Sequence, residues 1–85
     1  MKKQMNLTEA IIYRIKELSE EYNMPLSKWS MRAGITPSTI YGIMSKKAGC
    51  PRIQTIRLLC DVIGLTLSEF FNAEYIDAAE YDGSW

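Results

Sequence analysis

The chain has 85 residues, which is room for one small domain. It is 47% apolar and 24% charged, the balance of a folded soluble protein rather than a disordered one. No apolar run approaches the ~20 residues that a membrane span needs, and the N-terminus leads into no apolar segment of a secretory signal. So small a domain has little room for a deep catalytic cleft, so we expect a binding module and not an enzyme.

The reactive residue types are few. The chain has no histidine, and Cys50 and Cys60 form no CxxC pair, which disfavours zinc sites, His-based acid–base chemistry and Cys-His nucleophiles. We therefore expect no cofactor, no metal and no small-molecule ligand. Reduced thiols in a cytoplasmic protein are the simplest interpretation, with Cys60 in the core and Cys50 in a loop.

The first predicted helix begins at Asn6, where Glu9 three residues later completes a capping-box pattern. Apolar residues then recur at three- and four-residue steps to about Tyr22, which predicts one buried face. This face comprises Leu7, Ile11, Ile15, Leu18 and Tyr22. On the opposite side Arg14 is expected to be a solvated partner of Glu17 or Glu21.

A second, short helix follows Pro25, which is tolerated in a first helical turn. Trp29 and Ala33 lie four residues apart on it, and we expect Trp29 to be buried in the core. Gly34 ends this helix. Thr36 then has the residue type of an N-cap for a third helix.

The third, fourth and fifth helices are also indicated by spacing and caps. The apolar positions of the third helix are Ile40, Ile43 and Met44, and those of the fourth are Ile53, Ile56, Leu59, Cys60 and Ile63. Gly64 closes the fourth helix, and a capping box of Thr66 and Glu69 opens the fifth. No segment alternates convincingly between apolar and polar residues, so the predicted fold is all-α with five helices.

The net charge of zero conceals a strong segregation along the chain. Residues 22–60 carry no carboxylate and a charge of +6, from Lys28, Arg32, Lys46, Lys47, Arg52 and Arg57. Residues 61–85 carry no base and a charge of −6. The basic block favours a polyanionic partner, although chance clustering on a solvated surface is the alternative.

The second and third helices have the residues that a helix-turn-helix requires. Ser30 provides a small side chain where the two helices cross, and Gly34, four residues on, permits a turn with positive φ. Ile40 and Ile43 then bury the inner face of the third helix against Trp29.

From about Asn6 to Asn72 the sequence resembles the Cro/C1-type, or XRE-like, helix-turn-helix regulators of bacteria and their phages. The resemblance runs through residues 14–18, 34–41, 51–56 and 64–71. It implies a five-helix DNA-binding domain over residues 1–72, followed by an acidic tail over 73–85. It further implies a sequence-specific regulator of transcription, usually a repressor, that acts in the cytoplasm as a homodimer on paired half-sites of double-stranded DNA.

The resemblance also assigns roles to residues. The third helix, Pro37–Lys46, would enter the major groove with Pro37, Ser38, Tyr41, Gly42 and Ser45 facing the bases. The remaining DNA-binding positions would be Lys28, Thr36, Thr39, Lys46, Lys47 and Arg52. Around the fifth helix, a dimer contact would use Leu65, Leu67, Phe70 and Phe71.

Several positions depart from the family pattern. Leu26 stands where relatives have a phosphate-binding Gln, and Ser19 and Met44 stand where many relatives have an Arg–Glu pair. On the third helix, only hydroxyl-bearing side chains can hydrogen-bond to bases, and none makes the bidentate contacts of Arg, Asn or Gln. Methyl contacts and DNA shape would then carry more of the specificity. The alternative function is a protein-interaction module that has lost DNA binding.

The acidic tail allows two interpretations. A mobile tail would repel DNA from the basic surface within the screening length. A packed tail would place Tyr75, Ile76 and Ala79, which fall at helical spacing, against the body or across a dimer. We favour the packed tail, because aromatic residues are unusually frequent in it.

Overall fold

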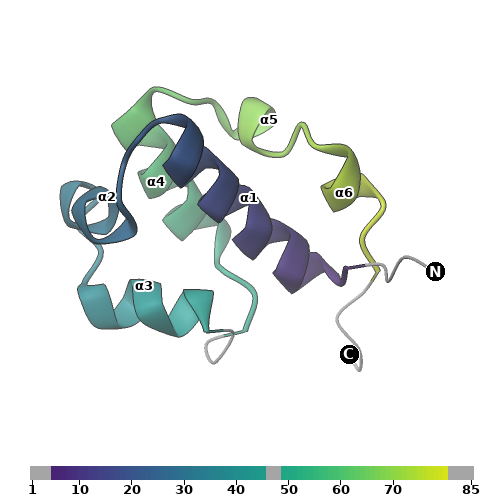
Figure 1. Cartoon of the computed structure of the whole chain (residues 1–85), viewed down its shortest axis with the longest axis horizontal. Helices are drawn as coiled ribbons and strands as arrows, with labels where there is room; N and C mark the ends of the chain where they lie inside the picture. Colours follow the sequence, from purple (N-terminus) through teal and green to yellow (C-terminus); the bar gives the residue numbers. More distant parts are fainter. Residues whose placement is uncertain (1–4, 46–48, 81–85) are drawn as a thin grey trace.

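A computed structural model of the chain describes residues 5–45 and 49–80, which form six helices and no strand. The helices are α1 (Leu7–Glu21), α2 (Leu26–Arg32), α3 (Pro37–Met44), α4 (Ile53–Ile63), α5 (Leu67–Phe70) and α6 (Glu74–Asp77). In Figure 1, α1 crosses the middle with α4 behind it, α2 and α3 lie to the left and below, and α6 lies at the right. In this part of the chain no helix has the length and apolar character of a membrane span.

The helix boundaries follow the local signals. At the start of α1, the Asn6 side chain accepts from the Glu9 backbone N–H at 2.8 Å, and the Glu9 carboxylate accepts from the Asn6 N–H at 3.1 Å. Thr66 and Glu69 form the same reciprocal pair at the start of α5. Gly64 ends α4 with a left-handed φ of 71°. Both predicted capping boxes and this helix end are confirmed.

Trp29 lies at the centre of the core. Its side chain is fully buried, and the indole N–H donates to the backbone carbonyl of Leu59 at 2.8 Å, which ties α2 to α4. Ser30 and Cys60 are also fully buried, as their small side chains and positions predict. The other completely buried large side chains are Phe70, Ile15, Leu18, Ile40, Ile56 and Leu59.

Ile53 departs from the prediction for α4. It was expected on the buried face, but it is 55% exposed. The residues four and eight positions further on, Arg57 and Asp61, form an exposed ion pair at 3.0 Å. Residues at this spacing share one side of a helix, so Ile53 lies on the solvent side of α4 rather than on the side of Ile56 and Leu59.

The segment after α5 adds a sixth helix to the five that were expected. Ile76 of α6 is buried, and the ring of Tyr75 meets that of Tyr13 on α1 edge-on, with centroids 5.0 Å apart. Beyond α6, Glu80 pairs with the start of the domain: Leu7 N–H donates to the Glu80 carbonyl at 2.8 Å. The packed interpretation of the tail is therefore confirmed for residues 73–80; Tyr81, Asp82 and Trp85 lie outside the described residues.

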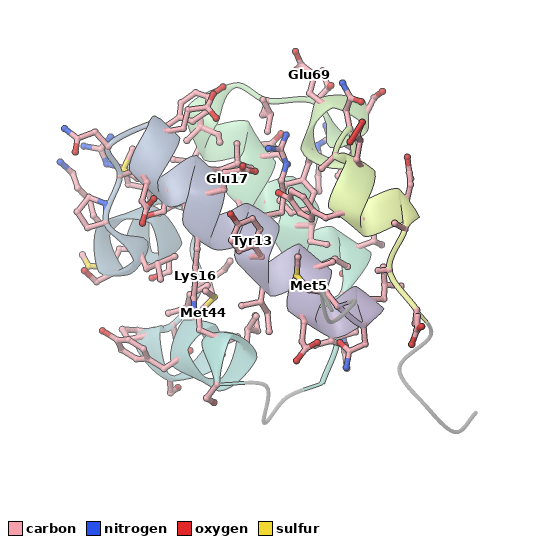
Figure 2. The ribbon with its side chains drawn as sticks, turned by 45° about the vertical axis from the view of Figure 1, so that its right-hand side comes forward. Met5, Tyr13, Lys16, Glu17, Met44 and Glu69 are labelled. Carbon is pink, nitrogen blue, oxygen red and sulfur yellow. The ribbon has the colours of Figure 1, made fainter. Side chains whose placement is uncertain are left out.

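Arg14 connects α1 to α5, and its partner Glu17 connects α1 to α6. Its guanidinium pairs with Glu17 at 2.8 Å and donates to the backbone carbonyls of Phe70 at 2.7 Å and Glu69 at 2.8 Å. The Tyr75 hydroxyl donates to the same Glu17 oxygen. Figure 2 shows Glu17 on α1, with Glu69 on α5. Glu17 was correctly predicted as a partner, but the expectation of a solvated Arg14 was wrong, because its side chain is only 13% exposed.

These contacts shift two pKa values in opposite directions. The hydrogen bonds from Tyr75 and then Arg14 lower the pKa of Glu17, since both stabilise the carboxylate. Burial, followed by the bond to Glu17, raises the pKa of Tyr75.

Removing the C-terminal segment should destabilise the domain. A chain that ends at Asn72 lacks Tyr75, Ile76 and the pairing of Glu80 with residues 5–7. Burial of Ile76 alone is worth about 1.5–3 kcal/mol, and each kcal/mol shifts the melting temperature of a domain this size by about 4–8 °C. We expect circular dichroism to show a melting temperature lower by about 10 °C or more.

The matched control is Glu74→Gln in the whole chain, since Glu74 is an exposed residue of α6. It should melt with the parent, and Ile76→Ala should fall between the parent and the truncated chain. If the chain that ends at Asn72 melts like the parent and binds DNA more tightly at low salt, the tail acts instead by electrostatic repulsion of DNA.

The lowered pKa of Glu17 predicts a pH dependence. Above its ordinary pKa of 4.5 the carboxylate contributes its full stabilisation, and the contribution is lost as pH falls through the lower pKa of the folded state. Glu17→Gln should therefore reduce stability at pH 7 and flatten its decline in acid. Urea unfolding between about pH 7 and pH 3 measures this difference. Glu20→Gln, at an exposed position of the same helix, should leave the stability at pH 7 unchanged.

Candidate nucleic-acid interface

The turn between α2 and α3 is tight and closed by backbone hydrogen bonds. Gly34 has a φ of 77°. Its N–H donates to the Met31 carbonyl, and the Ile35 N–H donates to the Ser30 carbonyl at 2.8 Å. A Cβ on Gly34 would meet no heavy atom within 4 Å, so the backbone conformation and not crowding calls for glycine. Together with the buried Ser30 below the turn, this is the helix-turn-helix geometry that the sequence predicts.

The third helix is anchored on one side and open on the other. Ile40 and Ile43 are buried against the core, and the Thr36 side chain caps the helix by accepting from the Thr39 N–H. On the opposite side Tyr41 is 60% exposed. The helix ends at Met44, with Ser45 as its C-cap, and Lys46, at the end of the approximate predicted range, lies outside the described residues.

The predicted DNA-binding residues that the structure describes lie on the surface, apart from Gly42, which is half-buried. The exposed ones are Lys28, Thr36, Pro37, Ser38, Thr39, Tyr41, Ser45 and Arg52. Lys46 and Lys47 lie outside the described residues. The exposure of these groups leaves them accessible to a macromolecule without any change of the fold.

The outer side of α3 carries a shallow, open hollow that is not apparent from the sequence pattern. It is lined by Ser38, Tyr41, Gly42, Met44 and Ser45, and its walls are mostly apolar. A glycine in the interior of a predicted helix was the available signal, because glycine is a poor helix former and leaves space beside the backbone.

The start of α4 differs from the starts of α1, α3 and α5. Arg52 occupies its N-cap position, and its side chain makes no capping hydrogen bond. The Arg52 side chain is itself exposed. The first-turn amides of a helix that its N-cap side chain does not cap, and an adjacent guanidinium, both favour an anion, so this end of α4 is suited to a phosphate.

The charges are separated in space as they are in sequence. Lys28 and Arg32 are exposed on α2, Arg52 is exposed at the start of α4, and the sequence segment 22–60 that contains them has no carboxylate. Glu74 and Asp77 are exposed on α6. Figure 1 places α2 and α6 on opposite sides of α1, so the acidic helix lies away from the basic surface.

The positions that depart from the family pattern have structural roles here. Leu26 and Met44 are half-buried and pack against the core. The Ser19 hydroxyl donates to the Met24 carbonyl at 2.6 Å, which connects the end of α1 to the segment before α2. Figure 2 shows Met44 close below Lys16 of α1 in that view. Ser19 and Met44 together replace the Arg–Glu pair of many relatives, so neither position is left with an unpaired buried charge.

The expected dimer residues divide into two groups. Leu65, Leu67 and Phe71 are half-buried and pack against the edge of the core. Phe70 is fully buried, with Phe71 edge-on against it at 5.0 Å. The expectation that Phe70 contributes to a dimer surface was wrong, because its ring fills the interior of one copy.

The helix-turn-helix geometry agrees with the comparison of the chain with known families. The family model described as Cro/C1-type HTH DNA-binding domain matches residues 14–75, from the middle of α1 into α6. The chain belongs to this family. The Cro/C1-type domain thus carries a DNA-binding fold, which confirms the resemblance and the all-α class predicted from the sequence. No significant match was found among curated proteins or among solved structures.

Proposed function

We propose that this Cro/C1-type domain is a sequence-specific regulator of transcription that places α3 in the major groove of double-stranded DNA. The observation that carries the proposal is the outer side of α3, which is exposed while its inner side is anchored by Ile40 and Ile43. The family match supplies DNA as the class of partner. In this function the protein binds and does not catalyse, and it needs no cofactor.

Two regions of the surface suit the phosphate backbone on either side of α3. Lys28 lies in the first turn of α2, and Arg52 lies beside the uncapped start of α4. Thr36 and Thr39 add hydroxyl groups at the start of α3, and Lys46 and Lys47 follow its end in the sequence. Such contacts determine the orientation of the protein on DNA but carry no sequence information themselves.

Repression is the simplest regulatory outcome of this binding. A protein that occupies a promoter blocks it without contacting any other protein. We therefore propose a repressor that acts on promoter DNA in the cytoplasm of a bacterium or of a phage-infected cell, as in the Cro/C1-type regulators that the sequence resembles.

A homodimer would compensate for the weak hydrogen-bonding capacity of α3. One half-site recognised by hydroxyl groups alone gives little discrimination, and two copies on paired half-sites multiply it. Leu65, Leu67 and Phe71 are partly exposed apolar side chains outside the DNA-facing side, and we propose them as the contact.

The alternative is a protein-interaction module that keeps the fold without binding DNA. It is favoured by the absence from α3 of any side chain with bidentate base-binding geometry. The basic residues around α3 argue against it, because a +6 segment without carboxylates suits a polyanion better than a typical protein surface.

Salt dependence separates the two functions. Lys28→Ala and Arg52→Ala should each weaken binding to all duplexes about equally and reduce the slope of log K against log salt by about one unit. Fluorescence anisotropy over a range of salt concentrations measures both effects. Arg57→Ala is the matched control, because Arg57 is already paired with Asp61, and its effect on the slope should be smaller. Equal slopes for the parent and a Lys28→Ala, Arg52→Ala double variant would contradict the proposed docking.

The dimer predicts a defined stoichiometry and spacing. After selection of bound sequences from a random duplex library, sedimentation should show two copies on a duplex whose half-sites lie about 10 bp apart. Insertion of half a helical turn between the half-sites should weaken binding of the second copy, because the two sites then face different sides of the DNA. A strict 1:1 complex on the palindromic duplex would overturn the homodimer.

A further inference from the structure

Among the described residues, the outer side of α3 presents one large side chain, Tyr41, beside small ones. Tyr41 projects into solvent, while Ser38, Gly42 and Ser45 leave the helix backbone thinly covered beside it. The hollow described above lies at this place, and Met44 completes its lining. If this side of α3 approaches the edges of the bases, it presents to them the ring of Tyr41 and the mostly apolar hollow.

The hydroxyl groups on this side are partly occupied within the protein. The Ser45 hydroxyl donates to the Gly42 carbonyl at 3.1 Å. The Thr36 hydroxyl pairs with that of Thr39 at 2.8 Å and lies 3.3 Å from that of Ser38. These internal bonds reduce the capacity for polar base recognition, so the apolar surface becomes the more distinctive feature of the helix.

Gly42 makes the hollow possible at a cost to the helix. It lies inside α3, whose backbone is α-helical, and it is not among the residues with positive φ. The backbone conformation at this position would accept alanine, which stabilises a helix better than glycine does. What glycine provides is the open space beside Tyr41.

The major groove has one apolar feature that distinguishes base pairs, the C5-methyl group of thymine. We propose that the hollow beside Tyr41 receives this methyl group, with Tyr41 as the specificity-determining side chain and Gly42 as the residue that keeps the space open. The inference rests on the proposed function, because it requires α3 to lie in the major groove. Specificity would then be for thymine at one or two positions of each half-site, recognised by contact rather than by paired hydrogen bonds.

The test uses the parent chain and duplexes that differ by single methyl groups. In the sequence obtained by selection, each thymine is replaced in turn by deoxyuridine, which lacks the methyl group and keeps the Watson–Crick pair. We expect binding to weaken about fourfold at one or two positions per half-site, the effect of one buried methyl group. Substitution at the other thymines should leave the affinity unchanged.

Variants of α3 then locate the contact. Gly42→Ala places a methyl group of the protein beside Tyr41, where the thymine methyl group would lie, so it should reduce the preference for thymine over deoxyuridine and melt at a higher temperature than the parent. Tyr41→Phe should keep the preference for thymine, because the ring remains, whereas Tyr41→Ser should lose it. Phosphate contacts are untouched in all three variants, so their salt slopes should match that of the parent.

The outcomes separate this inference from the proposed function. Sequence-specific binding with no effect of deoxyuridine at any position would overturn the methyl contact and leave the regulator intact. Loss of the thymine preference in Tyr41→Phe would also overturn it, in favour of a hydrogen bond from the hydroxyl group. Failure of the parent chain to bind any duplex would overturn both.

Discussion

The position of α3, the helix that we propose to face DNA, depends on the burial of Trp29. Its ring occupies the centre of the core, and its N–H has a partner there in the Leu59 carbonyl, so α2 is tied to α4 by a hydrogen bond that is itself shielded from water. The turn at Gly34 then carries the chain from α2 directly into α3. Because the turn is short and closed by backbone bonds, the orientation of α2 largely determines that of α3. The buried side chain of Trp29 thus determines how the exposed side chain of Tyr41 is presented on the surface.

Much of the fold is predictable because its signals are local. The capping boxes at Asn6 and Thr66 involve groups three residues apart, and the helix end at Gly64 requires only a residue that tolerates positive φ. Burial of Trp29 follows from its size and its position in a short helix beside a small residue. These features need no knowledge of what lies elsewhere in the chain. The family match covers the same segments, and it confirms the helix-turn-helix as well as the all-α class.

The features that escaped prediction depend on contacts between distant residues. Arg14 was expected in solvent because Glu17 and Glu21, three and seven residues further along the same helix, offer it acidic partners. Its other partners, the backbone carbonyls of Phe70 and Glu69, lie more than fifty residues away. An apolar side chain such as Phe70 does not reveal whether it fills its own core or that of a second copy. Ile53 shows a different difficulty: it is the first apolar residue of the periodic pattern in α4, yet it lies on the solvent side of the helix. The hollow on α3 depends on surface shape, which spacing does not describe.

The pairing of Glu80 with residues 5–7 joins segments separated by almost the whole described chain. Contacts of such long range form late in folding, since closing a long loop costs entropy that local contacts do not. During synthesis, α1 leaves the ribosome well before residues 74–80 do. Until they emerge, the part of α1 that later meets Tyr75 of α6 stays uncovered. The helix-turn-helix can thus assemble on a nascent chain whose first helix is still incompletely covered, and this interval is when the domain is most open to proteolysis and to association with other nascent chains.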